Sequence, residues 1–509
     1  MLATSGEVRP DNSGTRSISS PGSAPAAGIC YSDLISALSF AIDLTEGAVP
    51  GHALRSCVLG MRIGAEIGLD SADLAALYYA LLLKDIGCSS NAARMCQIVG
   101  GDDRAVKNGA KLADWTRPLR PDGDTLRMLW KQVLPGANAL ARALRIAWLG
   151  LTQHKNNEEM IAMRCERGAD IARQLGLSDE TAGAIHALDE HWDGKGYPRH
   201  LRGEEIPLLS RVLAVAQHLD VFATERNPEL AVSVLCERGE RWFDPELVKV
   251  VLKLDAEGRL WSQCLSTDPS ERTREIVLEL QPEISSKIEG DEIDRICEAF
   301  AAVVDAKSPF TYRHSRGVAD VAAGLATALC LSTERVQLVR RAALLHDLGK
   351  LAVPNTILDK SGDLTADEWD IVAQHPRLTK EILTRIDSFA ELAEVAGAHH
   401  EKLDGSGYPD GLSGSQLCLE ARIIAVADIY QAMTEGRPYR AGMSHGEAMR
   451  MLARLAPHKL DANCIAALDW VRSSRYAKDM AKKEPQAAPL RKGVRSEVMG
   501  EPRPLRATA

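Results

Sequence analysis

The sequence predicts an all-α fold, arranged as two tandem helical bundles. Aromatic residues make up only 5% of the 509 residues, and Ala and Leu are abundant, a composition that favours helix over sheet. Apolar residues recur at the spacing of an amphipathic helix in 318–328, 336–345 and 423–433, whereas strand patterns are hard to find. The two halves of the chain also repeat the same internal spacings, which predicts one bundle in each half.

The first repeated spacing joins a histidine to a motif that contains an aspartate. In the first half, Lys84-Asp85 follow His52 by 32 positions (84 − 52 = 32). In the second half, His346-Asp347 follow His314 by the same distance (346 − 314 = 32).

The second repeated spacing begins at a Gly-Tyr-Pro block. Asp193 and Asp404 open the two copies of this block, and an Arg-led apolar run starts 18 positions later in each, at Arg211 and Arg422 (211 − 193 = 18; 422 − 404 = 18). The glycines place both blocks in loops. Because chance seldom preserves two such distances, the sequence predicts an internal duplication.

Local signals place one helix of the second half. Thr365 with Glu368 three residues later, ahead of an apolar run, is a capping box and predicts a helix start. That helix should end near His375-Pro376, because the residue before a proline is pushed out of helical geometry.

Composition shifts suggest the domain boundaries. The two copies differ mainly by an insertion in the first, which contains helical apolar patches and could cover the cleft of that copy. We expect a disordered N-terminus over 1–27, a first bundle over 28–254 with the insertion at about 91–152, a linker over 255–290, a second bundle over 291–476, and a disordered tail over 477–509.

Composition also bounds the class of protein. No run approaches the roughly eighteen apolar residues of a membrane span, and the Ser-, Gly- and Pro-rich N-terminus lacks the apolar core of a signal peptide, so we expect a cytoplasmic protein. The 11 cysteines form no CxxC pair, which disfavours a disulfide framework. A net charge of −9 argues against a broad surface for a nucleic-acid polymer, but it leaves room for a phosphate substrate in a local cleft.

Seven metal-type donors gather in the second half. Asp428 follows an apolar helical stretch, where an unpaired carboxylate would be costly, and His346-Asp347 likewise follow Ala342 to Leu345. A helical bundle typically builds a metal centre from imidazole and carboxylate groups on several of its helices. The donors are His314, His346, Asp347, His375, His399, His400 and Asp428. Taken singly, His375 could be a helix-end residue and His314 an exposed one, but the set together predicts a metal site.

These motifs resemble a known family. His346-Asp347, with Leu348-Gly349-Lys350 after them, resembles the HD phosphohydrolase signature, and His399-His400-Glu401 with the 404–409 block resembles its HD-GYP subgroup. The resemblance is strong over 305–468 and degraded over 51–251. It implies two tandem HD-type bundles, the first degenerate, and two or three iron or manganese ions. It also implies hydrolysis of cyclic di-GMP, a bacterial second messenger, to linear pGpG, with slower cleavage to GMP as an option.

The resemblance also implies a ligand set. His314, His346, Asp347 and Asp428 would serve one ion, and His375, His399 and His400 the other, with Asp347 bridging. Members with three ions carry a glutamate four residues before the first histidine, where this chain has Phe310. We therefore expect two divalent ions, with His346 and Asp347 essential for catalysis because paired cations generate a nucleophile and polarise the phosphoryl oxygens.

Four further residues are candidates for substrate contacts. Lys350 could neutralise the phosphate as charge develops, although a surface lysine at a helix end is the alternative. Arg437 and Arg440 could grip the second phosphate or a guanine, or could lie in a solvated turn. Tyr408 could stack on a base or contact a partner, or simply pack in its loop.

The first half has lost most of these donors. Lys84 stands where the second half has His346, and Arg164 stands where it has His375. Leu188, Asp189 and Gln217 match His399, His400 and Asp428. Two cations beside the surviving His52 and Asp85 would repel a metal ion, so we expect neither metal nor catalysis there. The copy could still pack on the active half or bind a regulatory ligand.

Other functions remain open on the sequence. The chain could hydrolyse another cyclic dinucleotide, such as 3′,3′-cyclic GMP-AMP, or it could be a non-catalytic receptor or scaffold that signals to partners such as diguanylate cyclases. The seven intact donors disfavour a pure scaffold, and the Gly-Tyr-Pro block argues against a dNTP phosphohydrolase. The sequence leaves a homodimer open.

Overall fold

The structure of the chain is a computed structural model, and it describes residues 29–114, 123–262, 269–282, 287–288, 290–309, 313–436 and 441–472. The predicted all-α fold is confirmed over these residues. Their only strands are β1 (Ile29–Cys30) and β2 (Lys287–Ile288), which pair antiparallel with Ile29 opposite Ile288. The termini that the sequence predicts to be disordered lie outside the described residues.

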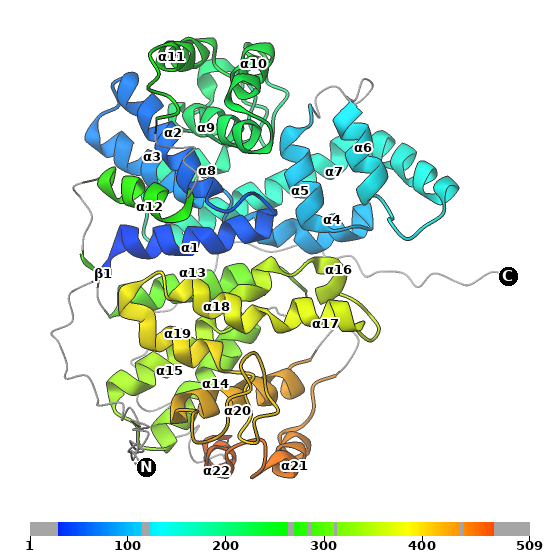
Figure 1. Cartoon of the computed structure of the whole chain (residues 1–509), viewed down its shortest axis with the longest axis vertical. Coiled ribbons are helices and arrows are strands. Elements are labelled where there is room, and N and C mark those ends of the chain that lie inside the picture. The colour runs from blue at the N-terminus through cyan, green and yellow to red at the C-terminus, as the bar shows by residue number, and fades with distance from the viewer. Residues whose placement is uncertain are drawn as a thin grey trace, which may run out of the picture. The chain divides into compact units, whose positions relative to one another are not determined.

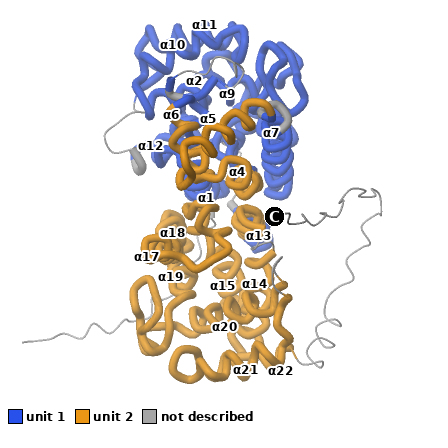
Figure 2. Tube along the Cα trace, turned by 90° about the vertical axis from the view of Figure 1, so that its right-hand side faces the viewer, with its two compact units in different colours: residues 1–88, 107–126, 152–296 blue, residues 89–106, 127–151, 297–509 orange. Residues whose placement is uncertain are grey.

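The described chain divides into two compact units (Figure 2). The first comprises 1–88, 107–126 and 152–296, and the second comprises 89–106, 127–151 and 297–509. Both units therefore draw on the predicted insertion.

The first unit is built largely from the N-terminal helices (Figure 1). Up to the insertion these are α1 (Tyr31–Glu46), α2 (His52–Glu66) and α3 (Ser71–Leu83), and the 3-10 helix η1 (Cys88–Asn91) follows at the boundary with the second unit. The insertion holds α4 (Ala92–Val99), α5 (Asp103–Leu112), α6 (Gly123–Gln132) and the start of α7 (Ala139–Gln174). After it come α8 (Asp179–His186), η2 (Gly203–Glu205), α9 (Leu208–Glu225), α10 (Pro228–Arg238), α11 (Pro245–Ala256) and α12 (Pro269–Glu279).

The helices of the second half follow α13 (Asp291–Asp305). They are α14 (His314–Ala328), α15 (Thr333–Leu345), η3 (Leu348–Ala352), α16 (Asn355–Leu358), α17 (Ala366–Ala373), α18 (His375–Leu383), η4 (Asp387–Phe389), α19 (Ala390–Gly397), α20 (Leu419–Thr434), α21 (His445–Leu455) and α22 (Ala462–Arg472). None of the described helices combines the length and hydrophobicity that crossing a bilayer requires.

The duplication is visible in the helix boundaries. Helix α14 begins and ends 262 positions after α2 (314 − 52; 328 − 66), and α15 lies 262 positions after α3 (333 − 71; 345 − 83). Helix α19 lies 211 positions after α8 (390 − 179; 397 − 186). The change of offset from 262 to 211 reflects the insertion.

Equivalent helices also pack in the same way within each unit. Helix α2 packs against α3 and α9, and α14 packs against α15 and α20. These contacts bury aliphatic side chains such as Leu59 and Leu81 in one unit and Leu325 and Leu344 in the other. Burial of this apolar surface stabilises each bundle.

The same capping arrangement starts the equivalent helices α2 and α14. The carboxylate of Asp43 accepts the backbone N–H of Ala53 at 3.1 Å, and that of Asp305 accepts the N–H of Ser315 at 3.2 Å, ten residues on in both cases. Such carboxylates satisfy amide groups that have no partner within the first turn of a helix. Each one fixes the start of the helix whose first residue is His52 or His314.

Two other sequence predictions concern local structure. The capping box at Thr365 and Glu368 is present, and α17 ends at Ala373, just before His375-Pro376. A new helix, α18, then begins at His375 with the proline in its first turn. In the predicted linker, α12 packs against α1 and α2 of the first unit.

Candidate metal centre

The seven predicted donors come together in the second unit, most of them at helix ends. His314 and His375 are the first residues of α14 and α18, and His346 caps the C-terminus of α15. Asp347 precedes η3, and His399 and His400 follow α19, whereas Asp428 lies inside α20. All but His400 are buried, and the side chain of His400 is only 22% exposed.

Asp347 lies between two groups of imidazoles. Its Oδ2 is 3.3 Å from Nε2 of His346, while its Oδ1 is 3.3 Å from Nε2 of His375 and 3.7 Å from Nε2 of His399. The two carboxylate oxygens therefore face different sides. This is the placement that a bridging ligand needs.

Three of the histidines form a hydrogen bond between ring atom Nδ1 and a backbone carbonyl oxygen. Nδ1 of His346, His375 and His399 each lies 2.7 Å from the carbonyl oxygen three residues earlier. Since a carbonyl only accepts, Nδ1 carries the proton and Nε2 presents a lone pair to the centre. This is the tautomer in which an imidazole ligates a metal.

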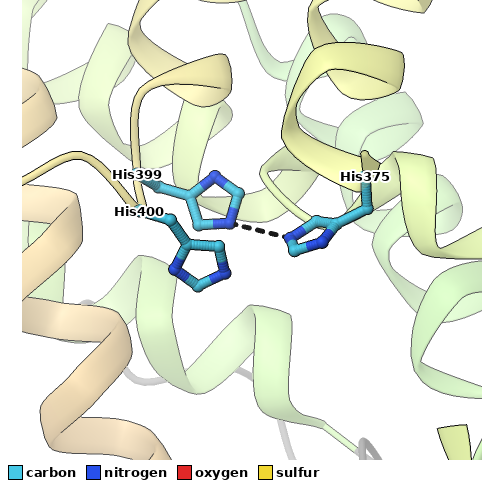
Figure 3. A group of neighbouring side chains, drawn as sticks. All are labelled: His375, His399 and His400. Atoms are coloured by element: carbon cyan, nitrogen blue, oxygen red, sulfur yellow. Dashed lines mark hydrogen bonds between the residues drawn. The ribbon is translucent and has the colours of Figure 1, made fainter. Parts of the chain in front are cut away.

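Two of these lone pairs point at one another. Nε2 of His375 lies 3.2 Å from Nε2 of His399, with His400 beside them (Figure 3). Nitrogen atoms of these three rings come within 4.8 Å of one another. Two acceptors at such a distance repel unless a cation or a proton lies between them, so the geometry favours a bound cation.

Burial keeps this group of rings neutral. Burial lowers the pKa of His375, His399 and His400, that of His400 to about 3. The neighbouring histidines lower the pKa of His399 further. Neutral imidazole is the form that binds a divalent ion, so the environment prepares these three side chains as ligands.

The opposite side of the centre contains a carboxylate that sequence reasoning missed. Nδ1 of His314 lies 3.1 Å from Oε2 of Glu435, and its Nε2 lies 3.1 Å from Oδ1 of Asp428. Burial opposes protonation of this ring, but the two carboxylates raise the pKa of His314 to about 9. Glu435 directly follows α20, and its only sequence signal is its position seven residues after Asp428.

The turn formed by residues 346–349, called the His-Asp turn below, lies against α18 with a close contact between the two backbones. A Cβ atom at Gly349 would lie 2.1 Å from the carbonyl oxygen of His375, so only glycine fits. The hydroxyl of Thr379 accepts the N–H of Gly349 and donates to the carbonyl of His346, both at 2.9 Å. These contacts hold Asp347, which precedes η3, close to His375 at the start of α18.

The Gly-Tyr-Pro loop lies next to the same histidines. The carboxylate of Glu401 accepts the backbone N–H groups of Asp410 and Leu412 at 2.7 and 2.9 Å, which fixes the loop. Tyr408 packs on His400, with the ring centroids 4.7 Å apart, and its edge meets Trp369. Tyr408 thus borders the centre, as a substrate contact requires.

Of the other predicted substrate residues, only Lys350 is described. Its Nζ lies 2.6 Å from Oδ2 of Asp347, and its side chain is 21% exposed. Lys350 is therefore a partly exposed side chain whose ammonium group lies beside Asp347. Arg437, Arg440 and Phe310 lie outside the described residues.

In the first unit, the corresponding place is occupied by positively charged lysine and arginine side chains. Lys84 donates to Asp85, and Lys111 from α5 lies 3.2 Å from the other oxygen of Asp85 and 3.0 Å from Glu46. Arg164 forms an ion pair with Asp189. Ammonium and guanidinium groups occupy the positions where the second unit gathers imidazoles, so the charge balance there opposes a metal ion.

The surviving histidine of the first unit is also tied to other groups. Nδ1 of His52 lies 2.6 Å from Asp220, which in turn accepts from Nε of Arg55 at 2.6 Å. Burial, together with the nearby charges of Lys84 and Lys111, lowers the pKa of His52 to about 4. His52 therefore belongs to a buried structural network.

The donor set of the second unit fits divalent cations. Nε2 of His346 and Oδ1 of Asp347 are buried and make no hydrogen bond to any described residue, although each is an acceptor aimed at the centre. Buried acceptors without donors cost free energy unless a cation satisfies them. In this unit three groups of donors lie within 4.8 Å of one another: His375, His399 and His400; His314, His346 and Asp347; and His346, His399 and Asp428. A fourth such group, Glu46, Asp85 and Cys88, lies in the first unit beside Lys111.

Comparison with known proteins identifies the family of the chain. A family described as HD domain matches residues 150–247 and 298–464. The 3′3′-cGAMP-specific phosphodiesterase 3 of Vibrio cholerae is 41% identical over 438 residues, which cover 86% of this chain and 93% of the relative. A cyclic di-GMP phosphodiesterase response regulator of Xanthomonas campestris is 34% identical over 230 residues, covering 44% of this chain and 60% of the relative.

A solved structure is similar over most of the chain. The crystal structure of a cyclic GMP-AMP specific phosphodiesterase from Vibrio cholerae aligns with a TM-score of 0.60 and 36% identity, covering 87% of this chain and 97% of that one. The resemblance seen in the motifs thus extends through both halves. The chain belongs to the HD domain family, and within it to the HD-GYP type.

Proposed function

We propose that this protein is a metal-dependent phosphodiesterase that opens a 3′,3′-cyclic dinucleotide to its linear form. The observation that carries the proposal is the place of Asp347, with one oxygen toward His346 and the other toward His375 and His399. Paired divalent ions are a recurring solution to phosphodiester hydrolysis, and a bridging carboxylate holds such a pair.

The chain's donors would hold two ions of iron or manganese. His314, His346 and Asp428 would serve one, His375, His399 and His400 the other, with Asp347 shared. Divalent ions so held lower the pKa of water and polarise phosphoryl oxygens. Mixed imidazole and carboxylate ligands suit iron and manganese, both of which accept nitrogen and oxygen donors.

The residues around the centre then act on the substrate. Lys350 has a partly exposed side chain beside Asp347, from which its ammonium group can donate to a phosphate oxygen as negative charge develops. Tyr408 offers an aromatic face beside His400 on which a base can stack. Glu435 holds the ring of His314 in its ligating orientation.

Two cyclic dinucleotides are the leading substrates, 3′,3′-cyclic GMP-AMP and cyclic di-GMP. We favour 3′,3′-cyclic GMP-AMP, because the relative named for that specificity is similar over 86% of this chain. The cyclic di-GMP phosphodiesterase of Xanthomonas campestris is similar over only 44% of it. We place the reaction in the cytoplasm, where diguanylate cyclases are candidate partners.

We further propose that the first unit, with its lysines and arginine, neither binds metal nor catalyses. The support is the contact of Lys84 and Lys111 with Asp85. The first bundle of 28–254 and the second of 291–476 are then a silent and an active copy of one duplicated unit.

One experiment tests the proposal. The full chain is purified without oxygen, its iron and manganese are quantified, and the same sample is given each cyclic dinucleotide in turn. We expect a linear product from the native chain and none from Asp347→Ala. Metal-loaded protein that leaves both dinucleotides intact would overturn the proposed activity.

A further inference from the structure

The loop that carries Lys350 is held by side chains from distant parts of the second unit. The loop runs from η3 through α16, residues 348–358. Lys307 donates its Nζ to the carbonyl of Leu351 at 2.9 Å. Arg104 donates to the next carbonyl, that of Ala352. These two carbonyls belong to the two residues that follow Lys350.

A third contact fixes the end of the loop. Oδ1 of Asp103 accepts the backbone N–H of Asn355 at 2.9 Å, at the start of α16. The amide of Asn355 in turn donates to the carbonyl of Lys307 at 2.7 Å and to Asp359 at 2.8 Å. The loop is therefore held at positions 351, 352 and 355 by a connected set of hydrogen bonds.

The side chains that form these hydrogen bonds are buried, so water cannot replace a lost partner. Asp103 and Asn355 are 0% exposed and Lys307 is 1% exposed. Nζ of Lys307 lies 3.9 Å from Oδ2 of Asp103, so the buried ammonium and carboxylate groups offset one another. Because an unpaired buried charge is costly, removing either partner should disturb the loop backbone.

The backbone at these positions sets the direction of Lys350. The N–H of Lys350 donates to the carbonyl of Asp347 at 2.9 Å, and its own carbonyl accepts from Val353 at 3.0 Å. The residue thus lies in a short turn that is fixed at one end by a proposed metal ligand. The other end is fixed by Arg104, Lys307 and Asp103. Nζ of Lys350 lies 2.6 Å from Oδ2 of Asp347.

Two of the three side chains come from the insertion. Asp103 and Arg104 are the first residues of α5, in the segment 89–106 that groups with the second unit. Helix α4 of the same segment packs on α16. The segment therefore completes the support of a loop that lies about 250 residues later in the sequence.

We propose that Asp103 and Arg104 are positioning residues, which hold the 348–358 loop so that Lys350 meets the substrate phosphate. This inference rests on the proposed function for the role of Lys350. The loop support itself is independent of that function.

A double-mutant cycle in the full chain tests the inference. Asp103→Ala should lower kcat about 10-fold, because a misplaced catalytic group costs rate steeply, while metal content stays unchanged. Asp103→Asn keeps an oxygen that accepts the N–H of Asn355 and should retain more activity. In a Lys350→Ala background, Asp103→Ala should have little further effect, since both changes act through one group. Asp170→Asn, an exposed carboxylate paired with Arg173, is the matched control.

A second readout does not need activity. Amide hydrogen exchange over 348–358 should quicken in Asp103→Ala and Arg104→Ala but not in Asp170→Asn. Unchanged exchange, or a loss of kcat that persists in full on top of Lys350→Ala, would overturn the inference. If the native chain hydrolyses no dinucleotide, the proposed function fails, whereas the exchange result still decides whether the loop is held in this way.

Discussion

The carboxylate of Glu435 lies 3.1 Å from Nδ1 of His314, on the far side of the ring from Asp428. A hydrogen bond from Nδ1–H to a carboxylate orients an imidazole and increases the basicity of the nitrogen that faces a metal. Glu435 is therefore part of the centre although it does not touch the other donors.

The first prediction concerns this pair. Glu435→Ala should weaken metal binding by about 10- to 100-fold, as is typical when such a supporting carboxylate is lost. Chelator competition on the purified chain measures the change. Glu394→Ala removes an exposed carboxylate that pairs with Lys380, and it should leave metal affinity unaltered. Equal affinities for the native chain and Glu435→Ala would show that His314 needs no such support.

The second prediction concerns the close approach at Gly349. Gly349→Ala places a methyl group 2.1 Å from the carbonyl oxygen of His375, so the His-Asp turn must move away from α18. We expect lost metal and a destabilisation of about 1–3 kcal/mol, the usual cost of forcing atoms into a packed site. Metal analysis and urea unfolding measure both effects. Gly362→Ala is the control, because nothing lies within 4 Å of a Cβ there.

The third prediction concerns the filled centre of the first unit. Lys111→Met leaves Glu46 and Asp85 buried with one cation fewer, and it should destabilise the chain by about 3–5 kcal/mol. Lys249→Met, at a side chain that is 70% exposed, should leave the free energy of unfolding close to that of the native chain, because an exposed ion pair contributes little. Urea unfolding compares the two. If Lys111→Met were as stable as the native chain, the lysine would not be compensating the buried carboxylates.

The fourth prediction concerns acid sensitivity. His191 is buried and stacks on Trp242, and burial lowers its pKa from 6.5 to about 3. The unfolded chain takes up a proton below about pH 6.5 that folded His191 does not accept until about pH 3. Stability contributed by the neutral ring is therefore present above pH 6.5 and falls as the pH drops. The loss should reach about 2 kcal/mol at pH 5.

His191→Phe tests this directly, since phenylalanine can pack on Trp242 without titrating. Relative to the native chain, the variant should gain about 2 kcal/mol in free energy of unfolding between pH 7.5 and pH 5. His458→Phe, at an exposed position, should show no such relative gain. Parallel pH profiles for His191→Phe and the native chain would contradict the assignment.

The fold and the main donors could be predicted because their signals are local or periodic. Asp428 stands out in the sequence because it interrupts an apolar helix. The spacing between His314 and His346 equals that between His52 and Lys84, and the structure shows the reason: α14 and α15 have the same lengths as α2 and α3. The helix start at Thr365 follows from two side chains only three residues apart. Such features depend on neighbours in the sequence.

The remaining features depend on contacts between distant segments. Glu435 is an ordinary acidic residue beyond a helix end until α14 brings His314 beside it. Lys111 and Asp103 lie in an insertion whose partners, Asp85 and Asn355, are set by packing alone. No spacing rule in a single sequence connects these pairs, so their roles emerge only from the structure.

The most direct test of the account is the metal content of the chain purified without oxygen, measured beside Asp347→Ala and Lys84→Ala. We predict two ions per chain in the native protein, loss of both in Asp347→Ala because its carboxylate is shared, and no change in Lys84→Ala. Native protein without bound metal, or Asp347→Ala that keeps both ions, would contradict the claim that the second unit gathers its histidines around a bridged pair.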